Sequence, residues 1–229
     1  MNKKIKTKNY PNYTELKLDY STANIFNPSF IKLFYNSLIN LDNSCNLIIK
    51  GNGNFFSSGL DLFYTNELKQ NELIEFIELF ESLLMLILNR EGKTLAYING
   101  HTIAGGFILA SSCDRAYCKN HKLKIGMNEE RLKIKLPPLS NAILRFTYQN
   151  NLSKVLNQKK YHTIKEFQKL NHFTYGEISF DSIKKDTNRL SNIKKYLEIS
   201  KKQQMKLFVK SWFSVESIKS RNELLETIK

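Results

Sequence analysis

The sequence of 229 residues predicts an α/β fold. Short apolar segments end in turns rich in Gly and Asn, a helical pattern follows them, and this alternation recurs along the chain. No internal repeat or long linker interrupts it. We expect residues 1–180 to form the core of the fold and residues 181–229 to form a helical region of the same domain.

The first half of the chain contains two predicted strands and two predicted helices. Residues 16–20 predict a short strand, and residues 28–41 carry apolar side chains at helical spacing. A buried strand is expected at 45–50, where the Gly-Asn turn at 51–54 ends it. Residues 71–88 place apolar side chains on one face and glutamates on another, so they predict the clearest amphipathic helix of the chain.

The second half continues the alternation and then becomes more polar. Asn99-Gly100 ends one predicted strand, and Pro137-Pro138 precedes a predicted helix. The expected elements are a strand at 94–98, a helix at 105–112, strands at 116–117 and 123–125, a helix at 142–148, short helical pieces within 150–180, and lysine-rich helices at 182–198 and 201–225.

The composition is typical of a soluble globular protein. Hydrophobic residues make up 41% of the chain, and the mean hydropathy is −0.39. The longest apolar run, residues 83–88, is six residues long, whereas about 20 are needed to span a bilayer. The N-terminus is basic, but no apolar segment follows it as in a secretory signal. We therefore expect a cytoplasmic protein without a membrane partner.

Charge and cysteine content narrow the classes of partner. Subtracting 21 acidic from 35 basic residues gives a net charge of +14, which would suit nucleic acid, an acidic membrane surface or a phosphorylated ligand. The lysines are scattered, with one short run at 3–8, so no nucleic-acid partner is expected. Cys45, Cys113 and Cys118 are odd in number and lack metal-ligand spacing, so neither disulfides nor a metal site are indicated.

Two Gly-centred loops carry the strongest functional signal. Residues 54–62 read Asn-Phe-Phe-Ser-Ser-Gly-Leu-Asp-Leu, and residues 98–114 contain Asn-Gly-His-Thr-Ile-Ala-Gly-Gly. Each loop opens a helix after a strand, so the pair can aim two backbone N–H groups at one oxygen and stabilise the enolate of a thioester. Singly, each reads as an ordinary turn or a close helix contact; together they favour an oxyanion hole.

These segments resemble the crotonase superfamily of enoyl-CoA hydratases and isomerases, in which a Phe-Ser-x-Gly-x-Asp loop and an Asn-Gly-x-x-x-x-Gly-Gly loop build the oxyanion hole. The resemblance implies a spiral of ββα units with a C-terminal helical region, assembled as a homotrimer or a dimer of trimers. Matched onto this chain, the oxyanion donors are the N–H groups of Leu60 and Gly105. The expected coenzyme A-binding residues are Ser57, Ser58, Gly59, Leu60, Asp61 and Gly105.

Glu129 is the candidate base. Its segment, Lys-Ile-Gly-Met-Asn-Glu-Glu-Arg-Leu-Lys-Ile at 124–134, is similar to the Gly-Leu-Asn-Glu-x-x-Leu-Gly-Ile segment of mitochondrial-type Δ3,Δ2-enoyl-CoA isomerases. Removing the proton α to a thioester needs a carboxylate beside an apolar pocket, where its pKa rises toward neutrality. The alternative is a solvated glutamate among charged neighbours. Lys133 replaces a glycine of the family, which could alter the loop.

The resemblance favours isomerisation within fatty acid metabolism. Hydratases of the family carry a second glutamate three residues after the middle glycine of the second loop, where this chain has Ile108. One base suffices to move a double bond from the 3- to the 2-position of an enoyl-CoA, and no cofactor or metal is implied beyond the coenzyme A of the substrate. The alternatives are hydration or decarboxylation of an acyl thioester, and a non-catalytic member that binds acyl-CoA.

Overall fold

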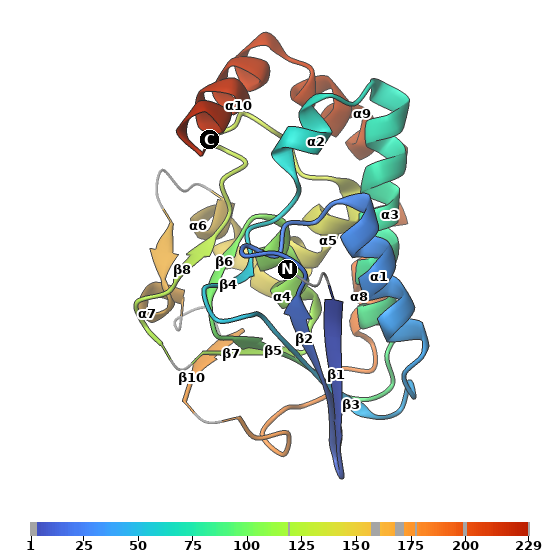
Figure 1. Ribbon diagram of the computed structural model, residues 1–229. Coiled ribbons are helices and arrows are strands. Elements are labelled where there is room, and N and C mark those ends of the chain that lie inside the picture. The colour runs from blue at the N-terminus through green and yellow to red at the C-terminus, as the bar shows by residue number, and fades with distance from the viewer. Residues whose placement is uncertain are drawn as a thin grey trace.

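Two sheets and the helices around them make up the fold (Figure 1). The computed structural model describes residues 4–118, 120–156, 161–167, 172–176, 178–198 and 201–228. The six-stranded sheet has the order β1 (Lys4–Tyr10), β2 (Tyr13–Asp19), β3 (Asn46–Lys50), β5 (Thr94–Ile98), β7 (Arg115–Cys118) and β10 (Phe173–Tyr175). The four-stranded sheet has the order β4 (Phe55–Ser57), β6 (His101–Ile103), β8 (Lys124–Gly126) and β9 (His162–Thr163).

A unit of two strands followed by helix recurs and forms the expected spiral. The units are β3 and β4 with α2 (Leu62–Asn66) and α3 (Gln70–Leu88), β5 and β6 with α4 (Gly105–Ser112), and β7 and β8 with α5 (Pro138–Tyr148). In each unit the first strand joins the six-stranded sheet and the second joins the four-stranded sheet. Because β4 and β6 pair in parallel, the two loops that follow them emerge side by side.

The predicted turns hold successive units together. The Gly51 N–H donates to Asn99 Oδ1 at 2.8 Å, and Asn99 Nδ2 donates to the Gly51 carbonyl at 3.0 Å. Gly100 passes so close to β4 that a Cβ there would lie 2.5 Å from Phe55 N. Turn chemistry that is visible in the sequence therefore also fixes how the first two units stack.

Helices α1 (Pro28–Ile39) and α3 pack against each other beside the six-stranded sheet. Asn27 caps α1 through a 2.9 Å hydrogen bond from Phe30 N, and Pro28 occupies the first turn, where its missing N–H costs little. The apolar faces of both helices and of β2 and β3 belong to one continuous core. This core also supports the two Gly-centred loops.

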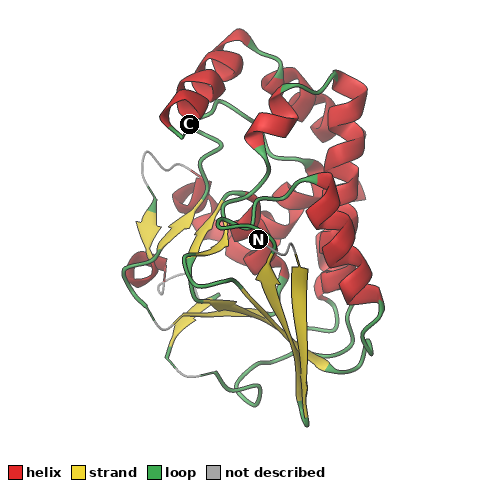
Figure 2. Cartoon of the chain, in the orientation of Figure 1, coloured by secondary structure: helices red, strands yellow, loops and turns green. Residues whose placement is uncertain are grey.

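The C-terminal half is mainly helical, as Figure 2 shows in red. Its helices are α6 (Leu152–Leu156), α7 (Ile164–Phe167), α8 (Arg189–Glu198), α9 (Lys201–Trp212) and α10 (Val215–Thr227), with a 3₁₀ turn at Gln149–Asn151. Helix α8 packs on α5, α9 packs on α3 and α5, and α10 packs on α2. Among the described helices, none is both long and apolar enough to cross a membrane.

Several expected elements need correction. Residues 4–10, where no strand was expected, form strand β1. Its lysines are compatible with a strand because β1 lies at the edge of the sheet and its side chains are mostly exposed. The helix expected over 182–198 begins only at Arg189, and the one expected over 201–225 is broken where Ser214 caps α10. Within 150–180, the short helices α6 and α7 are accompanied by strands β9 and β10.

Candidate active site

One small cavity, of about 60 Å³, brings the predicted site together. Ser58 and Leu60 of the first loop, Gly105 of the second loop and Glu129 all line it. The other lining residues are Leu62, Phe80, Ala104, Ile108, Asn128, Leu132, Ile134, Pro137, Ser140, Phe208 and Trp212. Residues from five separate parts of the sequence therefore meet at one place.

The backbone around Leu60 aims its N–H away from the neighbouring segment. Phe26 forms a parallel bridge with Leu60, in which Phe26 N donates to Gly59 O at 2.8 Å and Asp61 N donates to Phe26 O at 2.9 Å. In such a bridge both hydrogen bonds to Phe26 are made by the two residues that flank Leu60. The N–H of Leu60 itself therefore points to the opposite side. That side faces Gly105, since a Cβ on Gly105 would lie 3.4 Å from Leu60 N.

The second predicted donor, the N–H of Gly105, lies at the start of α4. The N–H of Gly105 belongs to the first turn, which has no acceptor within its own helix, and the partial positive charge of the helix end favours an anion there. The residue before it, Ala104, has φ 50° and ψ −120°, a backbone conformation that residues with a side chain rarely adopt. Its N–H is held by Gly126 O at 2.9 Å. Such strain is common at functional sites.

Glycines allow the two loops to touch backbone to backbone. A Cβ on Gly59 would lie 2.9 Å from Gly105 N, and Gly59 also has φ 96°, so a side chain there is excluded twice. A Cβ on Gly106 would lie 2.4 Å from Ser57 O. The sequence pattern of glycines thus reflects contact between the two loops.

Other predicted binding residues of the first loop hold its conformation through hydrogen bonds. The Ser57 hydroxyl is buried, donates to Asn24 O at 2.8 Å and accepts from Gly59 N at 3.1 Å. Asp61 caps α2 by accepting from Tyr64 N at 3.1 Å. Ser57, Gly59 and Asp61 therefore shape the loop, while Ser58 and Leu60 line the cavity.

Glu129 begins a single helical turn that ends in a Schellman motif. Ile134 N donates to Glu129 O at 2.9 Å, and Lys133 N donates to Glu130 O at 3.1 Å. Lys133 has φ 58°, the left-handed conformation that glycine usually supplies at this position. The turn thus keeps the glycine-like backbone although a lysine occupies it. The position of Glu129 does not depend on a glycine there.

The carboxyl group of Glu129 is held in an apolar environment. Burial raises its pKa from 4.5 to about 7, and hydrogen bonds from the backbone oppose this only in part. The Asn128 N–H donates to Glu129 Oε2 at 2.8 Å. A carboxylate with a pKa near neutrality can both take up and release a proton at physiological pH. Its environment is the one that the predicted base requires.

Tyr161 is a site residue that sequence reasoning missed. Strand β9 pairs antiparallel with β8, with His162 opposite Ile125. Tyr161, the residue before His162, therefore lies opposite Gly126. Its hydroxyl forms a side-chain hydrogen bond with Asn128, and its pKa is raised first by burial and then by the charge of Glu129. No local pattern in the sequence marks this tyrosine, since the pairing of two short strands brings it to the site.

Glu81, on α3, is a second buried carboxylate and was also missed. Its Oε1 accepts the Leu139 N–H at 2.7 Å and so caps the start of α5 from another helix. Burial raises the pKa of Glu81 to about 7. In the sequence it reads as one of four exposed glutamates of an amphipathic helix. Glu81 holds the Pro137–Ser140 wall of the cavity, but it does not line the cavity.

The remaining wall of the cavity is apolar. Ile108 is buried there, at the position where the resemblance to hydratases would require a second glutamate. Phe80 from α3 and Phe208 and Trp212 from α9 complete this wall. The aromatic pair of α9, whose ring centroids lie 5.8 Å apart, thus closes the site in addition to packing into the core.

Other residues that attract notice in the sequence are structural. Asp114 Oδ2 accepts from Thr94 N at 2.7 Å and from Lys185 Nζ at 3.0 Å. Cys113 and Cys118 are buried free thiols, and Cys45 is a partly buried one. Over the described ranges, no group of three or more His, Cys, Asp or Glu side chains is arranged to hold a metal ion.

Comparisons with known proteins show the family of the chain. The profile of the Enoyl-CoA hydratase/isomerase family matches residues 10–168. The peroxisomal enoyl-CoA delta isomerase 2 of Arabidopsis thaliana is 31% identical over 104 residues, which cover 43% of this chain and 43% of that protein. The matched part thus spans less than half of that relative.

Solved structures share the fold over nearly the whole chain. The human mitochondrial delta3-delta2-enoyl-CoA isomerase superposes with a TM-score of 0.84 at 17% identity, covering 98% of each chain. The enoyl-CoA hydratase from Bacillus halodurans superposes with a TM-score of 0.75 at 16% identity, covering 96% of this chain and 99% of that one. At these identities the likeness establishes the crotonase fold.

Proposed function

Because the chain belongs to the enoyl-CoA hydratase/isomerase family, we propose that it is an isomerase that moves the double bond of an enoyl-CoA from the 3- to the 2-position. The observation that supports this most is the single cavity shared by Leu60, Gly105 and Glu129. Coenzyme A lies along the loop at 57–61, and the thioester carbonyl oxygen accepts hydrogen bonds from the N–H groups of Leu60 and Gly105.

The proposed reaction consists of two proton transfers. Ionised Glu129 removes a proton from C2, and the electron pair of that C–H bond delocalises into the thioester as an enolate. The two N–H groups stabilise the developing charge on oxygen because they are oriented before reaction. Glu129, now protonated, returns the proton to C4, so the double bond moves to C2–C3 and the base is regenerated.

Hydration is the second candidate, since the family includes hydratases. Adding water across a double bond calls for a second carboxylate that positions and splits the water. The cavity presents the side chain of Ile108 at the corresponding place. This apolar residue favours isomerisation over hydration.

The proposed chemistry needs no cofactor or metal, because backbone dipoles stabilise the enolate and only protons move. A basic chain of net charge +14 suits the phosphates of coenzyme A. We further propose, on the family resemblance, that the protein forms a homotrimer or a dimer of trimers, and that it acts in the cytoplasm.

The test compares two reactions of the wild-type protein. Isomerisation of a 3-enoyl-CoA is followed by the ultraviolet absorbance of the conjugated thioester that it forms, and hydration of a 2-enoyl-CoA by loss of that absorbance. We expect isomerisation with little hydration. Faster hydration would replace the proposal by the hydratase alternative, and binding of acyl-CoA without either reaction would indicate a non-catalytic member.

A further inference from the structure

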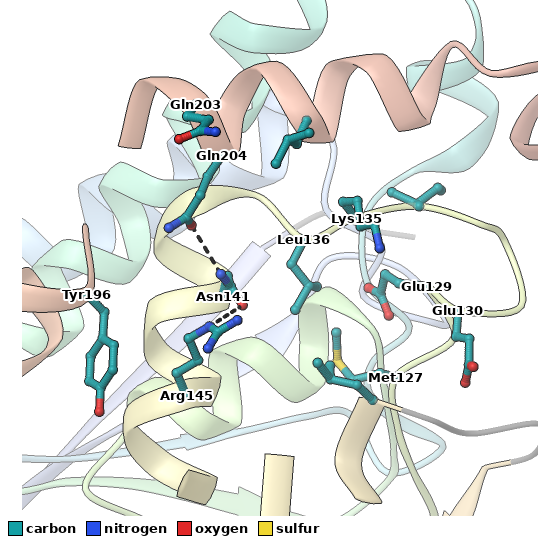
Figure 3. Close-up of a pocket in the computed structure, with 13 residues that line it drawn as sticks. Met127, Glu129, Glu130, Lys135, Leu136, Asn141, Arg145, Tyr196, Gln203 and Gln204 are labelled. Carbon is teal, nitrogen blue, oxygen red and sulfur yellow. Dashed lines mark hydrogen bonds between the residues drawn. The ribbon is translucent and has the colours of Figure 1, made fainter. Parts of the chain in front are cut away.

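A second and larger cavity, of about 770 Å³, begins at Glu129 (Figure 3). Glu129 and Ile134 line both this cavity and the smaller one, so the two cavities adjoin at these residues. The larger cavity is bounded by the segment at 127–136 and by α5, α8 and α9. It lies where an acyl chain that passes Glu129 would continue.

The lining of this cavity differs between its two sides. Near Glu129 it combines the apolar side chains of Met127, Ile134 and Leu136 with the charged ones of Glu130 and Lys135. The part along α5 is polar and includes Arg145, Asn141 and Gln204. Figure 3 shows these three side chains together, on the other side of Leu136 from Glu129. A plain hydrocarbon tail that reached them would remove their hydration and offer no hydrogen bond in return.

Arg145 is oriented by a chain of hydrogen bonds. Its Nε donates to Asn141 Oδ1 at 3.2 Å, and Asn141 Nδ2 donates to Gln204 Oε1 at 3.1 Å. These bonds link α5 to α9 and occupy only the Nε of the guanidinium. Among the residues that the structure describes, no carboxylate forms an ion pair with Arg145. Arg145 is exposed, so both solvent and an anionic ligand can reach its two terminal amino groups.

Position along α5 places Arg145 beyond the reacting atoms. Ser140 lines the smaller cavity, and Arg145 follows five residues later on the same helix. At 1.5 Å per residue this is about 7.5 Å along the helix axis. Glu130, an exposed carboxylate that also lines the cavity, lies on the far side of it from Arg145 in Figure 3.

We propose that this cavity selects enoyl-CoA substrates whose acyl chain ends in a carboxylate, with Arg145 as the specificity-determining residue. The inference rests on the proposed isomerase function. A terminal carboxylate can accept two charge-assisted hydrogen bonds from the guanidinium.

The experiment compares matched pairs of substrates. The kcat/KM of the wild type is measured for 3-hexenedioyl-CoA against 3-hexenoyl-CoA, and for longer pairs of the same kind, so that chain length does not decide the result. We expect the diacid of at least one pair to be preferred. Arg145→Ala should lower this preference about tenfold, because kcat/KM falls for the diacid and not for the monoacid. Lys219→Ala, which removes an exposed lysine of α10, should not change the preference.

Two results would overturn the inference. One is a wild type that favours the monoacid in every pair, and the other is an Arg145→Ala variant that loses diacid and monoacid turnover equally. If neither substrate reacts, the proposed function fails. The affinities for saturated adipoyl-CoA and hexanoyl-CoA, measured by calorimetry, then decide the charge preference separately: equal affinities contradict it, and an adipoyl preference that Arg145→Ala removes supports it.

Discussion

At Gly105 a hydrogen atom in place of a side chain would leave room for the thioester oxygen of the proposed reaction. A Cβ there would lie 3.3 Å from Gly59 Cα and 3.5 Å from the Phe80 ring, contacts that the fold can tolerate with small shifts. The methyl group would nevertheless occupy the space between the two proposed donors. The glycine at this position is thus explained by the reaction more than by folding.

The variant Gly105→Ala should therefore fold but lose activity. We expect kcat for isomerisation to fall by about 10²–10³, the loss that follows removal of one oxyanion donor. Steady-state kinetics measure this, and thermal unfolding checks the fold. Gly106→Ala is the matched contrast, since a Cβ there would lie 2.4 Å from Ser57 O and should mainly destabilise. Unchanged kinetics in Gly105→Ala would contradict the proposed hole.

As the proposed base, Glu129 should set the pH dependence of the reaction through its pKa. A base must be ionised to act, and burial raises the pKa of this carboxyl group to about 7. We expect kcat/KM to be low in acid, to rise through about pH 7 and to level off above it. Initial rates over this range give the curve. A midpoint near the ordinary glutamate value of 4.5 would contradict a base whose pKa is raised by burial.

At the scale of elements, the Schellman turn at 128–134 retains its shape at a cost. A lysine in the left-handed conformation is less stable than a glycine by about 1 kcal/mol. Lys133→Gly should therefore raise the free energy of unfolding by about that amount and leave activity unchanged, because the exposed side chain touches nothing in the site. Denaturant titration measures the change.

The control is Lys32→Gly, at an exposed position inside α1. There a glycine should lower the free energy of unfolding by about 1 kcal/mol. If Lys133→Gly also destabilises, the left-handed conformation at 133 is not the one the chain adopts.

Glu81 links the stability of α3 and α5 to pH. Its pKa is about 7 when folded and 4.5 ordinarily, so between these values the folded protein keeps a proton that the unfolded chain loses. The free energy of unfolding should thus fall as pH rises from about 4.5 to about 7, and then stay level. Glu129 adds a dependence of the same sign.

Glu81→Gln tests this, because the amide oxygen can still accept the Leu139 N–H while the charge is removed. The variant should be more stable than the wild type at pH 8 by about 1–3 kcal/mol and similar to it at pH 4.5, as measured by urea unfolding. Glu75→Gln, at an exposed position on the same helix, should change neither value. An equal loss of stability at both pH values would rule out the linkage.

At the scale of the whole molecule, the sequence predicts those elements that are determined by residues close together in the chain. The glycine turns, the amphipathic α3 and the two loops are confirmed because their patterns lie within short stretches. Strands β4 and β6, of three residues each, carry too little pattern to be recognised. Strand β1 was missed because its lysines suit an edge strand and a basic tail equally well.

Residues brought in by tertiary packing were beyond prediction. Tyr161 reaches the site through the pairing of β9 with β8, and Glu81 reaches α5 from another helix. Arg145 joins the larger cavity only because α9 packs across α5. For Lys133 the reverse holds, since the sequence suggested a disturbed loop and the backbone keeps the left-handed conformation.

The most direct test of single-base isomerisation is turnover of a 3-enoyl-CoA by Glu129→Gln, with Glu91→Gln as the control. Both changes remove one carboxylate, but Glu129 lines the cavity with Leu60 and Gly105, whereas Glu91 is exposed and lines neither cavity. We expect kcat to fall by about 10³ or more in Glu129→Gln and to stay within about twofold of the wild type in Glu91→Gln. Isomerisation that survives in Glu129→Gln, or that is lost equally in both variants, would contradict the assignment of Glu129 as the base.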